Sequence, residues 1–381
     1  MYNIAFLLGA GVSIPAGMPD VKELTNEIFS NYKNWCISNT AGQRFQTIVS
    51  FKHPNNFKPE QDEIFTIANF LKIVGSLLEK HTDNLELNSY EDVYDILFQI
   101  HAHISKNYEN PALQSLINEL QKNNSKPIDF LCTQSLKFIE DVVRYKLQTN
   151  SRIGKLEPLL KIIKLYDEKE IHIFTLNYDT LIEDYLSKKV TFHDGFTHKL
   201  YKDQVRIFQI DSLLYIKQRV HLYKLHGSFD WEYILNGKYN NRLVKIVKPM
   251  ENYPYFEFGG EERVYGRYTG LMGISNKLLN YNYGIFLEML MLLHIQLKKC
   301  NPLIISGYSF SDYGVNLRII DWMTRKRNAK IIFIDPFAEN TINKARGAIN
   351  TQIPIWRYEN RFNVITCGFQ DWDGNLDFYN I

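Results

Sequence analysis

Gly9-Ala10-Gly11-Val12-Ser13 directly follows the apolar run Asn3–Leu8, and this junction decides the fold that we expect. The run predicts a buried strand, because strands covered on both faces are continuously apolar. Glycines directly after such a strand allow a sharp turn and the close approach of a pyrophosphate. On this motif alone, a tight strand-to-helix turn without a ligand is an equally good interpretation.

Polar side chains follow two further predicted strands. Asn177 and Asp179 come after Ile171–Thr175, and His226 comes after Val220–Leu225. In a parallel α/β sheet the ligand crevice lies outside the carboxyl ends of the strands. The sequence therefore predicts that these three side chains share one site with the first glycine turn.

Each of these residues also has a plain structural interpretation. Asn177 and Asp179 are typical turn and helix-cap residues, and on the pair alone this reading is favoured. A neutral imidazole at His226 can accept a proton near neutral pH, but a histidine with satisfied hydrogen bonds at a strand end is commoner.

A second nucleotide-binding half is predicted near the end of the chain. Gly307 and Ser309 follow the predicted strand Leu303–Ser306, and Asp335 follows the strand Lys330–Ile334. An acidic side chain in the latter place binds a ribose hydroxyl in dinucleotide folds, although a plain turn is about as good an interpretation.

Residues 45–150 differ from the rest, because their apolar residues recur at helical spacing with almost no strand pattern. We therefore predict an α/β fold with a Rossmann-like parallel sheet, formed by residues 1–44 and 151–381, and an inserted all-helical module over residues 45–150.

Composition excludes several classes. With 44 basic and 42 acidic residues the net charge is +2, which does not indicate nucleic-acid binding. The longest apolar stretch, Phe286–Leu297, is too short and too polar to span a membrane. The four cysteines are too scattered for a zinc module or a disulfide framework, so no metal and a cytoplasmic location are expected.

The motifs together resemble the sirtuin family. Residues Gly11-Val12-Ser13-Ile14-Pro15-Ala16-Gly17-Met18-Pro19-Asp20 are similar to the sirtuin pattern G-x-S-x-x-x-G-I-P-D, with Met18 in place of Ile. Thr175, Asn177 and Asp179 match T-Q-N-x-D, with Leu176 in place of Gln, and His226-Gly227 matches the sirtuin H-G dipeptide. The resemblance covers about residues 1–35 and 155–350.

The resemblance implies that NAD is the substrate and that its nicotinamide–ribose bond is cleaved. It implies catalytic roles for Asn177, which holds water or ribose, for Asp179, which orients the carboxamide, and for His226, the base. The residues implied in binding NAD are Gly9, Ala10, Gly11, Ser13, Pro19, Asp20, Gly307, Ser309 and Asp335.

Two departures separate the chain from sirtuin deacylases. It lacks the four zinc cysteines, and it has Asp20-Val21-Lys22 where deacylases continue as D-F-R. Both features resemble the bacterial anti-phage branch, which hydrolyses NAD to nicotinamide and ADP-ribose in abortive infection. The motifs extend to residue 336 of 381, which resembles the standalone, oligomeric subunit that assembles with a HerA-type hexameric ATPase. The alternatives are an NAD-dependent protein deacylase and a non-catalytic nucleotide-binding subunit.

Overall fold

The chain forms two compact units in a computed structural model. The first comprises Met1–Met18, Asn150–Leu271 and Leu278–Ile381, and the second comprises Pro19–Thr149 and Met272–Lys277. The structure describes residues 2–39, 47–51, 61–81, 89–148, 155–200, 205–234, 242–246, 255–258, 262–265, 269–270, 272–273, 277, 279–282 and 284–376.

The domain limits drawn from the sequence, between residues 44 and 45 and between residues 150 and 151, lie outside the described residues. The compact units differ from that prediction in two respects, because residues 19–39 and the segment Met272–Lys277 belong to the second unit. The helix Val21–Phe29 contacts the helices Gln61–His81, Tyr90–Ile104 and Ile128–Gln148, which explains its place in the second unit. Its side chains Leu24 and Ile28 are buried.

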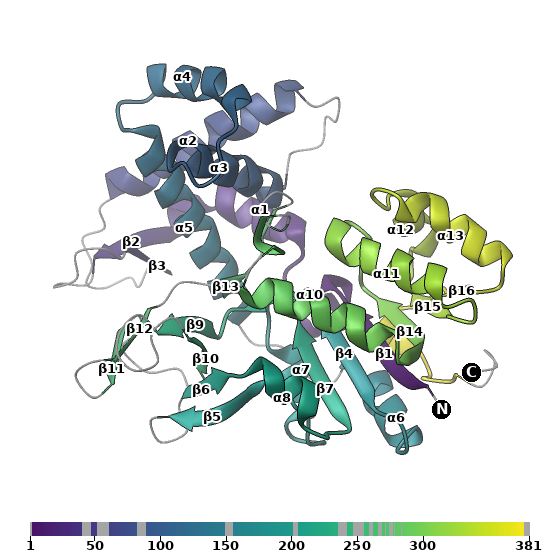
Figure 1. Ribbon diagram of the computed structural model, residues 1–381. Helices are drawn as coiled ribbons and strands as arrows, with labels where there is room; N and C mark the ends of the chain where they lie inside the picture. Colours follow the sequence, from purple (N-terminus) through teal and green to yellow (C-terminus); the bar gives the residue numbers. More distant parts are fainter. Residues whose placement is uncertain are drawn as a thin grey trace. The chain divides into compact units, whose positions relative to one another are not determined.

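A six-stranded parallel sheet forms the centre of the first unit (Figure 1). Its strands are β1 (Asn3–Leu8), β4 (Ile171–Thr175), β7 (Val220–Lys224), β14 (Cys300–Ser306), β15 (Ile331–Ile334) and β16 (Phe362–Ile365). Their spatial order is β16-β15-β14-β1-β4-β7, and every neighbouring pair is parallel. Counted in chain order, this is the 3-2-1-4-5-6 arrangement of doubly wound dinucleotide folds.

Helices cover both faces of this sheet. Side chains of α10 (Gly284–Leu297), α11 (Tyr313–Arg325), α12 (Ala338–Asn343) and α13 (Ile349–Tyr358) share one core with one face. Side chains of α6 (Glu157–Leu165), α7 (Leu181–Leu186) and the 3-10 turn η6 (Phe369–Asp371) form the core on the other face. The predicted Rossmann-like parallel sheet is thus confirmed, whereas β16, α12 and α13 were not predicted from the sequence.

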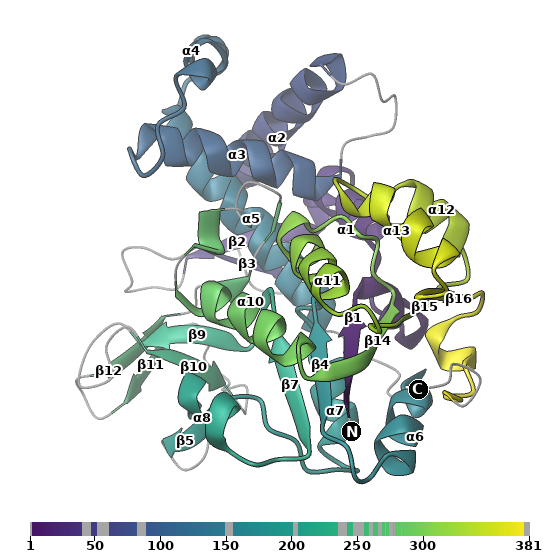
Figure 2. The same ribbon diagram turned by 45° about the vertical axis from the view of Figure 1, so that its right-hand side comes forward.

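An antiparallel sheet lies beside β7, the edge strand of the parallel sheet, in both views of the first unit (Figure 2). It runs β11-β12-β9-β10-β6-β5. Its strands are β5 (Phe196–Leu200), β6 (Val205–Phe208), β9 (Trp231–Ile234), β10 (Leu243–Ile246), β11 (Tyr255–Phe258) and β12 (Glu262–Tyr265). The helix α8 (Ile210–Tyr215) follows β6, and the short strands β8 (Gly227–Ser228) and β13 (Thr269–Gly270) pair with each other.

The second unit is built mainly from helices. These are α1 (Val21–Phe29), α2 (Gln61–His81), α3 (Tyr90–Ile104), α4 (Gln114–Lys122) and α5 (Ile128–Gln148). The Ser89 and Asp92 pair forms the capping box expected at the start of α3. The prediction of an all-helical module was wrong in one detail, because β2 (Trp35–Asn39) and β3 (Thr47–Phe51) pair as an antiparallel hairpin. The run Thr47–Phe51 contains β-branched and aromatic residues that favour a strand.

In the described ranges, no helix combines the length and the apolar content that crossing a bilayer requires.

Candidate active site

Two glycine turns meet where the strand order of the parallel sheet reverses. The chain leaves β1 at Gly9 and β14 at Gly307, and these two strands are neighbours. From β1 the sheet continues through β4 in one direction and through β14 in the other. A reversal of this kind opens a crevice at the carboxyl ends of the strands, which is where open α/β sheets bind ligands.

The two turns are packed so closely that none of the glycines Gly9, Gly11 and Gly307 tolerates a side chain. A Cβ atom on Gly9 would lie 2.3 Å from the carbonyl oxygen of Gly307, and one on Gly11 would lie 2.7 Å from the Gly307 Cα. Gly307 has φ +64°, and a Cβ there would lie 2.5 Å from the amide nitrogen of Val12. The Gly11 amide donates to the Gly307 carbonyl at 3.1 Å. The glycines therefore serve the mutual packing of the turns, which the sequence had not predicted.

The chain beyond the first turn differs from the expected loop-to-helix junction. Ala10–Val12 and Ile14–Ala16 form two short 3-10 turns, in which Ala10 and Gly11 are exposed and Ser13 is buried. The next α-helix begins at Val21 in the second unit, where the Asp20 side chain accepts a hydrogen bond from the Glu23 amide. Asp20 thus caps α1, and the binding roles implied for Pro19 and Asp20 stay predictions.

Asn177 connects the end of β4 to the first glycine turn. Its Nδ2 donates to the Gly9 carbonyl at 3.1 Å and to the Ser13 hydroxyl at 2.9 Å. Its backbone amide donates to the Thr175 hydroxyl at 3.1 Å. Because the two amide hydrogens are occupied, the side chain presents its carbonyl oxygen, an acceptor, for any further contact.

Asp179 is a turn residue before a helix, as the interpretation without a ligand predicts. Its Oδ1 accepts the Leu181 amide at 3.0 Å, which is a turn preceding α7, and the residue is 4% exposed. Its backbone carbonyl accepts a hydrogen bond from the Lys224 ammonium. One carboxylate oxygen is therefore committed to the fold, and the role implied by the resemblance rests on the other oxygen.

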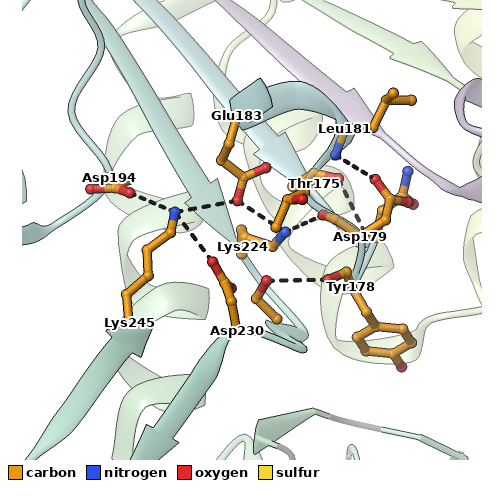
Figure 3. A network of polar contacts seen from close by, with 12 residues as sticks. Thr175, Tyr178, Asp179, Leu181, Glu183, Asp194, Lys224, Asp230 and Lys245 are labelled. Carbon is orange, nitrogen blue, oxygen red and sulfur yellow. Dashed lines mark hydrogen bonds and ion pairs between the residues drawn. The ribbon is translucent and has the colours of Figure 1, made fainter. Parts of the chain in front are cut away.

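A buried charge network lies directly behind this loop (Figure 3). Lys224 Nζ lies 3.1 Å from Glu183 Oε1, and Lys245 Nζ lies 3.6 Å from the same oxygen. Lys245 also contacts Asp194 at 2.9 Å and Asp230 at 3.7 Å. Burial raises the pKa of Glu183, an effect that the two ammonium groups reduce. Burial alone would lower the pKa of Lys245, but the three carboxylates outweigh it and raise that pKa.

His226 lies in a buried cluster with Tyr281 and Asp312, which were not among the predicted site residues. Its Nε2 is 2.9 Å from Asp312 Oδ2 and 2.9 Å from the Tyr281 hydroxyl, which itself donates to Asp312 Oδ2 at 2.9 Å. Asp312 also caps α11, because its Oδ1 accepts the Val315 amide. Its position before the helix gave a capping signal in the sequence, whereas no local signal marked Tyr281.

The Tyr308 hydroxyl lies next to this cluster and contacts the backbone of Asp312. Its hydroxyl donates to Asn316 Oδ1 at 2.8 Å and accepts the Asp312 amide at 3.2 Å. The pKa of Tyr308 and that of Tyr281 are both raised well above 10.0. Burial is the larger cause, and the negative charge of Asp312 is the second. Both hydroxyls therefore keep their protons over the physiological pH range.

Ser309 and Asp335 do not join these contacts in the part of the chain that the structure describes. Ser309 is exposed and its hydroxyl donates to Ser311 at 3.0 Å. Asp335 follows β15, where its carboxylate accepts the Phe337 amide at 2.6 Å and the Thr341 hydroxyl at 3.2 Å. Its contacts are those of a turn that starts α12, and the implied ribose contact is untested. Among the described residues, no group of three or more His, Cys, Asp or Glu side chains could hold a metal ion.

The strand order and the turns at its reversal define the first unit as a doubly wound domain of the Rossmann type. Within it, residues 171–353 match the family described as a SIR2-like domain. No curated protein matches the chain in sequence.

Solved structures of Sir2 proteins are similar to the chain at low identity. A Sir2 homolog in complex with NAD is 11% identical, with a TM-score of 0.42, over 97% of this chain and 85% of that chain. A Sir2 bound to an acetylated peptide is 11% identical, with a TM-score of 0.38, over 99% of this chain and 90% of that chain.

Proposed function

We propose that the first unit binds NAD at the crossover between β1 and β14 and hydrolyses its nicotinamide–ribose bond. The observation that carries this proposal is the close packing of Gly9 and Gly11 against Gly307, with Asn177 hydrogen-bonded to the same turn. A crossover of a doubly wound sheet is the usual place for a dinucleotide, and glycine turns at the ends of its strands allow a pyrophosphate to approach the backbone. The match of residues 171–353 to the SIR2-like domain family supports NAD as the dinucleotide.

The binding roles follow the position of each residue along the crevice. The exposed part of the two turns offers polar groups to NAD from Ala10, Gly11 and the Ser309 hydroxyl. The more buried part of the proposed crevice is formed by Gly9, Gly307 and Ser13. The Asp335 carboxylate accepts a hydrogen bond from an adenosine ribose hydroxyl, as acidic residues that follow a strand do in dinucleotide folds. Pro19 and Asp20 belong to the second unit, so the binding roles that the sirtuin motif implies for them are not part of the site proposed for the first unit.

The reacting end of NAD lies over Asn177 and Asp179. The second carboxylate oxygen of Asp179 accepts the nicotinamide carboxamide, and the Asn177 carbonyl oxygen holds a ribose hydroxyl or the attacking water. The bond from C1′ to the pyridinium nitrogen breaks through an oxocarbenium-like state, and its electron pair neutralises the leaving nicotinamide. Water forms the new C1′–O bond and gives one proton to His226, which later releases it to solvent.

Hydrolysis, rather than transfer to an acylated lysine, is the outcome that the sequence favours. Val21 stands where sirtuin deacylases carry the phenylalanine that shields the reactive ribose, and Lys22 stands in place of their arginine. We propose a role in abortive antiviral defence, in the cytoplasm, as a homo-oligomer with a HerA-type hexameric ATPase. This part of the proposal rests on the family resemblance alone.

Mass spectrometry of the products formed from NAD, with an acetyl-lysine peptide in the same reaction, tests the proposal. We expect nicotinamide and free ADP-ribose in equal amounts and an unchanged peptide. An acetylated ADP-ribose would identify a deacylase instead.

The His226→Ala variant is the control for contaminating activity, and it should lose turnover while its circular dichroism spectrum stays that of the wild type. Binding of NAD without any product, also in the presence of the ATPase, would favour a non-catalytic subunit.

A further inference from the structure

Two side chains converge on one carboxylate oxygen beside the proposed site. Asp312 Oδ2 lies 2.9 Å from His226 Nε2 and accepts the Tyr281 hydroxyl at 2.9 Å. Asp312 and His226 are each 4% exposed and Tyr281 is 7% exposed. The other oxygen of the carboxylate is held by the Val315 amide, so helix α11 fixes the orientation of the whole group.

The contact between His226 Nε2 and the Asp312 carboxylate favours a proton on Nε2. The Tyr281 hydroxyl has a single hydrogen, and the carboxylate takes it. An acceptor lone pair on Nε2 would then face the carboxylate oxygen at 2.9 Å, which is repulsive. A proton on Nε2 converts this contact into a charge-assisted hydrogen bond. In the neutral ring the acceptor nitrogen is therefore Nδ1.

We propose that Asp312 and Tyr281 are positioning residues, which hold His226 with its proton on Nε2 so that Nδ1 is the proton acceptor in the cleavage of NAD. This proposal rests on the proposed function and assigns the orientation of its base. When Nδ1 takes a proton of the attacking water, the ring becomes an imidazolium. The Asp312 carboxylate stabilises this cation without being protonated itself.

Two further tyrosines are titratable neighbours of this cluster. The Tyr308 hydroxyl contacts the Asp312 backbone, and the ring centroid of Tyr178 lies 6.3 Å from that of His226. A tyrosine hydroxyl is neutral at physiological pH. The acidic limb of the pH profile should therefore report on His226 and its partner Asp312.

The Asp312→Asn variant tests the proposal with little change of shape. Asparagine caps a helix about as well as aspartate, so the start of α11 is preserved. Its amide group presents a hydrogen to Nε2, which then has to be the acceptor, and the proton moves to Nδ1. We expect kcat to fall by about 10²–10⁴-fold with KM nearly unchanged.

Two further readouts separate positioning from simple loss of structure. Residual activity of Asp312→Asn should have its acidic limb at lower pH, because the imidazolium has lost its carboxylate partner. Tyr281→Phe removes one hydrogen bond to that carboxylate and should lower kcat roughly tenfold. The matched control is Asp321→Asn, on the same helix, whose carboxylate contacts Arg325 and His294 and should leave kcat unchanged.

Nitrogen NMR of protein labelled at histidine measures the tautomer independently of turnover. We expect an Nε2-protonated ring for His226 in the wild type, assigned by its loss in His226→Gln, and a change of tautomer in Asp312→Asn. A wild-type ring protonated on Nδ1, or an Asp312→Asn enzyme with normal kcat and an unmoved acidic limb, would overturn the proposal. If the tautomer is as expected but NAD is not cleaved, the proposed function fails while the assigned orientation of His226 stands.

Discussion

The Nε2 atom of His226 lies 2.9 Å from Oδ2 of Asp312, although the strands that precede these residues are not neighbours. His226 follows β7, Asp312 lies six residues beyond the end of β14, and β4 and β1 separate the two strands in the sheet. The segment after β14 therefore reaches across the carboxyl ends of β1 and β4. Gly9 and Asn177 follow β1 and β4 at the same edge of the sheet.

The packing of the two turns predicts a specific difference between two glycines. Gly307→Ala should lower the free energy of unfolding by about 2–4 kcal/mol, because the new methyl group meets backbone atoms and the residue has a positive φ. Gly17→Ala is the matched control, since Gly17 has φ +94° but no atom within 4 Å of the place that a Cβ would occupy. It should cost only the backbone strain, about 1 kcal/mol. Equal denaturation midpoints for the two variants would contradict the close packing.

Asn177 has two roles that one pair of variants can separate. Asn177→Ala removes the Asn177 donor from the buried Ser13 hydroxyl and from the Gly9 carbonyl, which keeps its bond from the Val12 amide. The loss should cost about 1–3 kcal/mol of stability and abolish NAD hydrolysis. Thr175→Val removes a neighbouring buried hydrogen bond but keeps the Asn177 side chain. It should lose similar stability and retain most of the turnover. Chemical denaturation and product formation, measured on both variants, decide whether turnover follows the side chain or merely the stability.

The positions of the motifs could be predicted from the sequence, whereas their contacts could not. Apolar β-branched runs such as Ile171–Thr175 and Ile331–Ile334 by themselves predict buried parallel strands. The polar residues that follow these runs indicate where the carboxyl ends of the strands lie. The contact between His226 and Asp312 depends on strand order and on the path of the chain after β14, which are long-range properties. Tyr281 precedes α10 without any motif, so its place beside His226 required the folded chain.

Two buried histidines, His172 on β4 and His221 on β7, predict how the free energy of unfolding depends on pH. The rings of His172 and His221 stack with centroids 5.2 Å apart, and His172 Nδ1 lies 3.0 Å from the Tyr223 hydroxyl. Burial, followed by the neighbouring His221 and Lys299, lowers the pKa of His172 to about 3. Burial also lowers the pKa of His221 to about 4.

Below pH 6.5 the unfolded chain protonates these histidines while the folded chain does not. Their contribution to stability is therefore complete above pH 6.5 and is lost as the pH falls toward 4 and then 3. Each adds a slope of up to about 1.4 kcal/mol per pH unit in that window. His172→Gln should remove one such slope, as measured by urea denaturation between pH 4 and 7. The idea fails if His103→Gln, a histidine variant in the second unit, flattens the curve equally.

The ion pair between Lys224 and Glu183 should stabilise the loop of Asp179 only as long as both partners are present. The side chains are 3% and 8% exposed, and Lys224 also donates to the Asp179 carbonyl. Lys224→Met leaves the Glu183 carboxylate buried with only the more distant Lys245, which should cost about 3–5 kcal/mol. The double variant Lys224→Met/Glu183→Leu should recover most of this loss, because a buried pair is often replaced by apolar side chains without penalty. The exposed pair Lys189 and Glu157, 3.0 Å apart, is the control, and Lys189→Met should cost less than about 1 kcal/mol. If Lys224→Met is as mild as Lys189→Met in denaturation measurements, the buried network does not hold this loop.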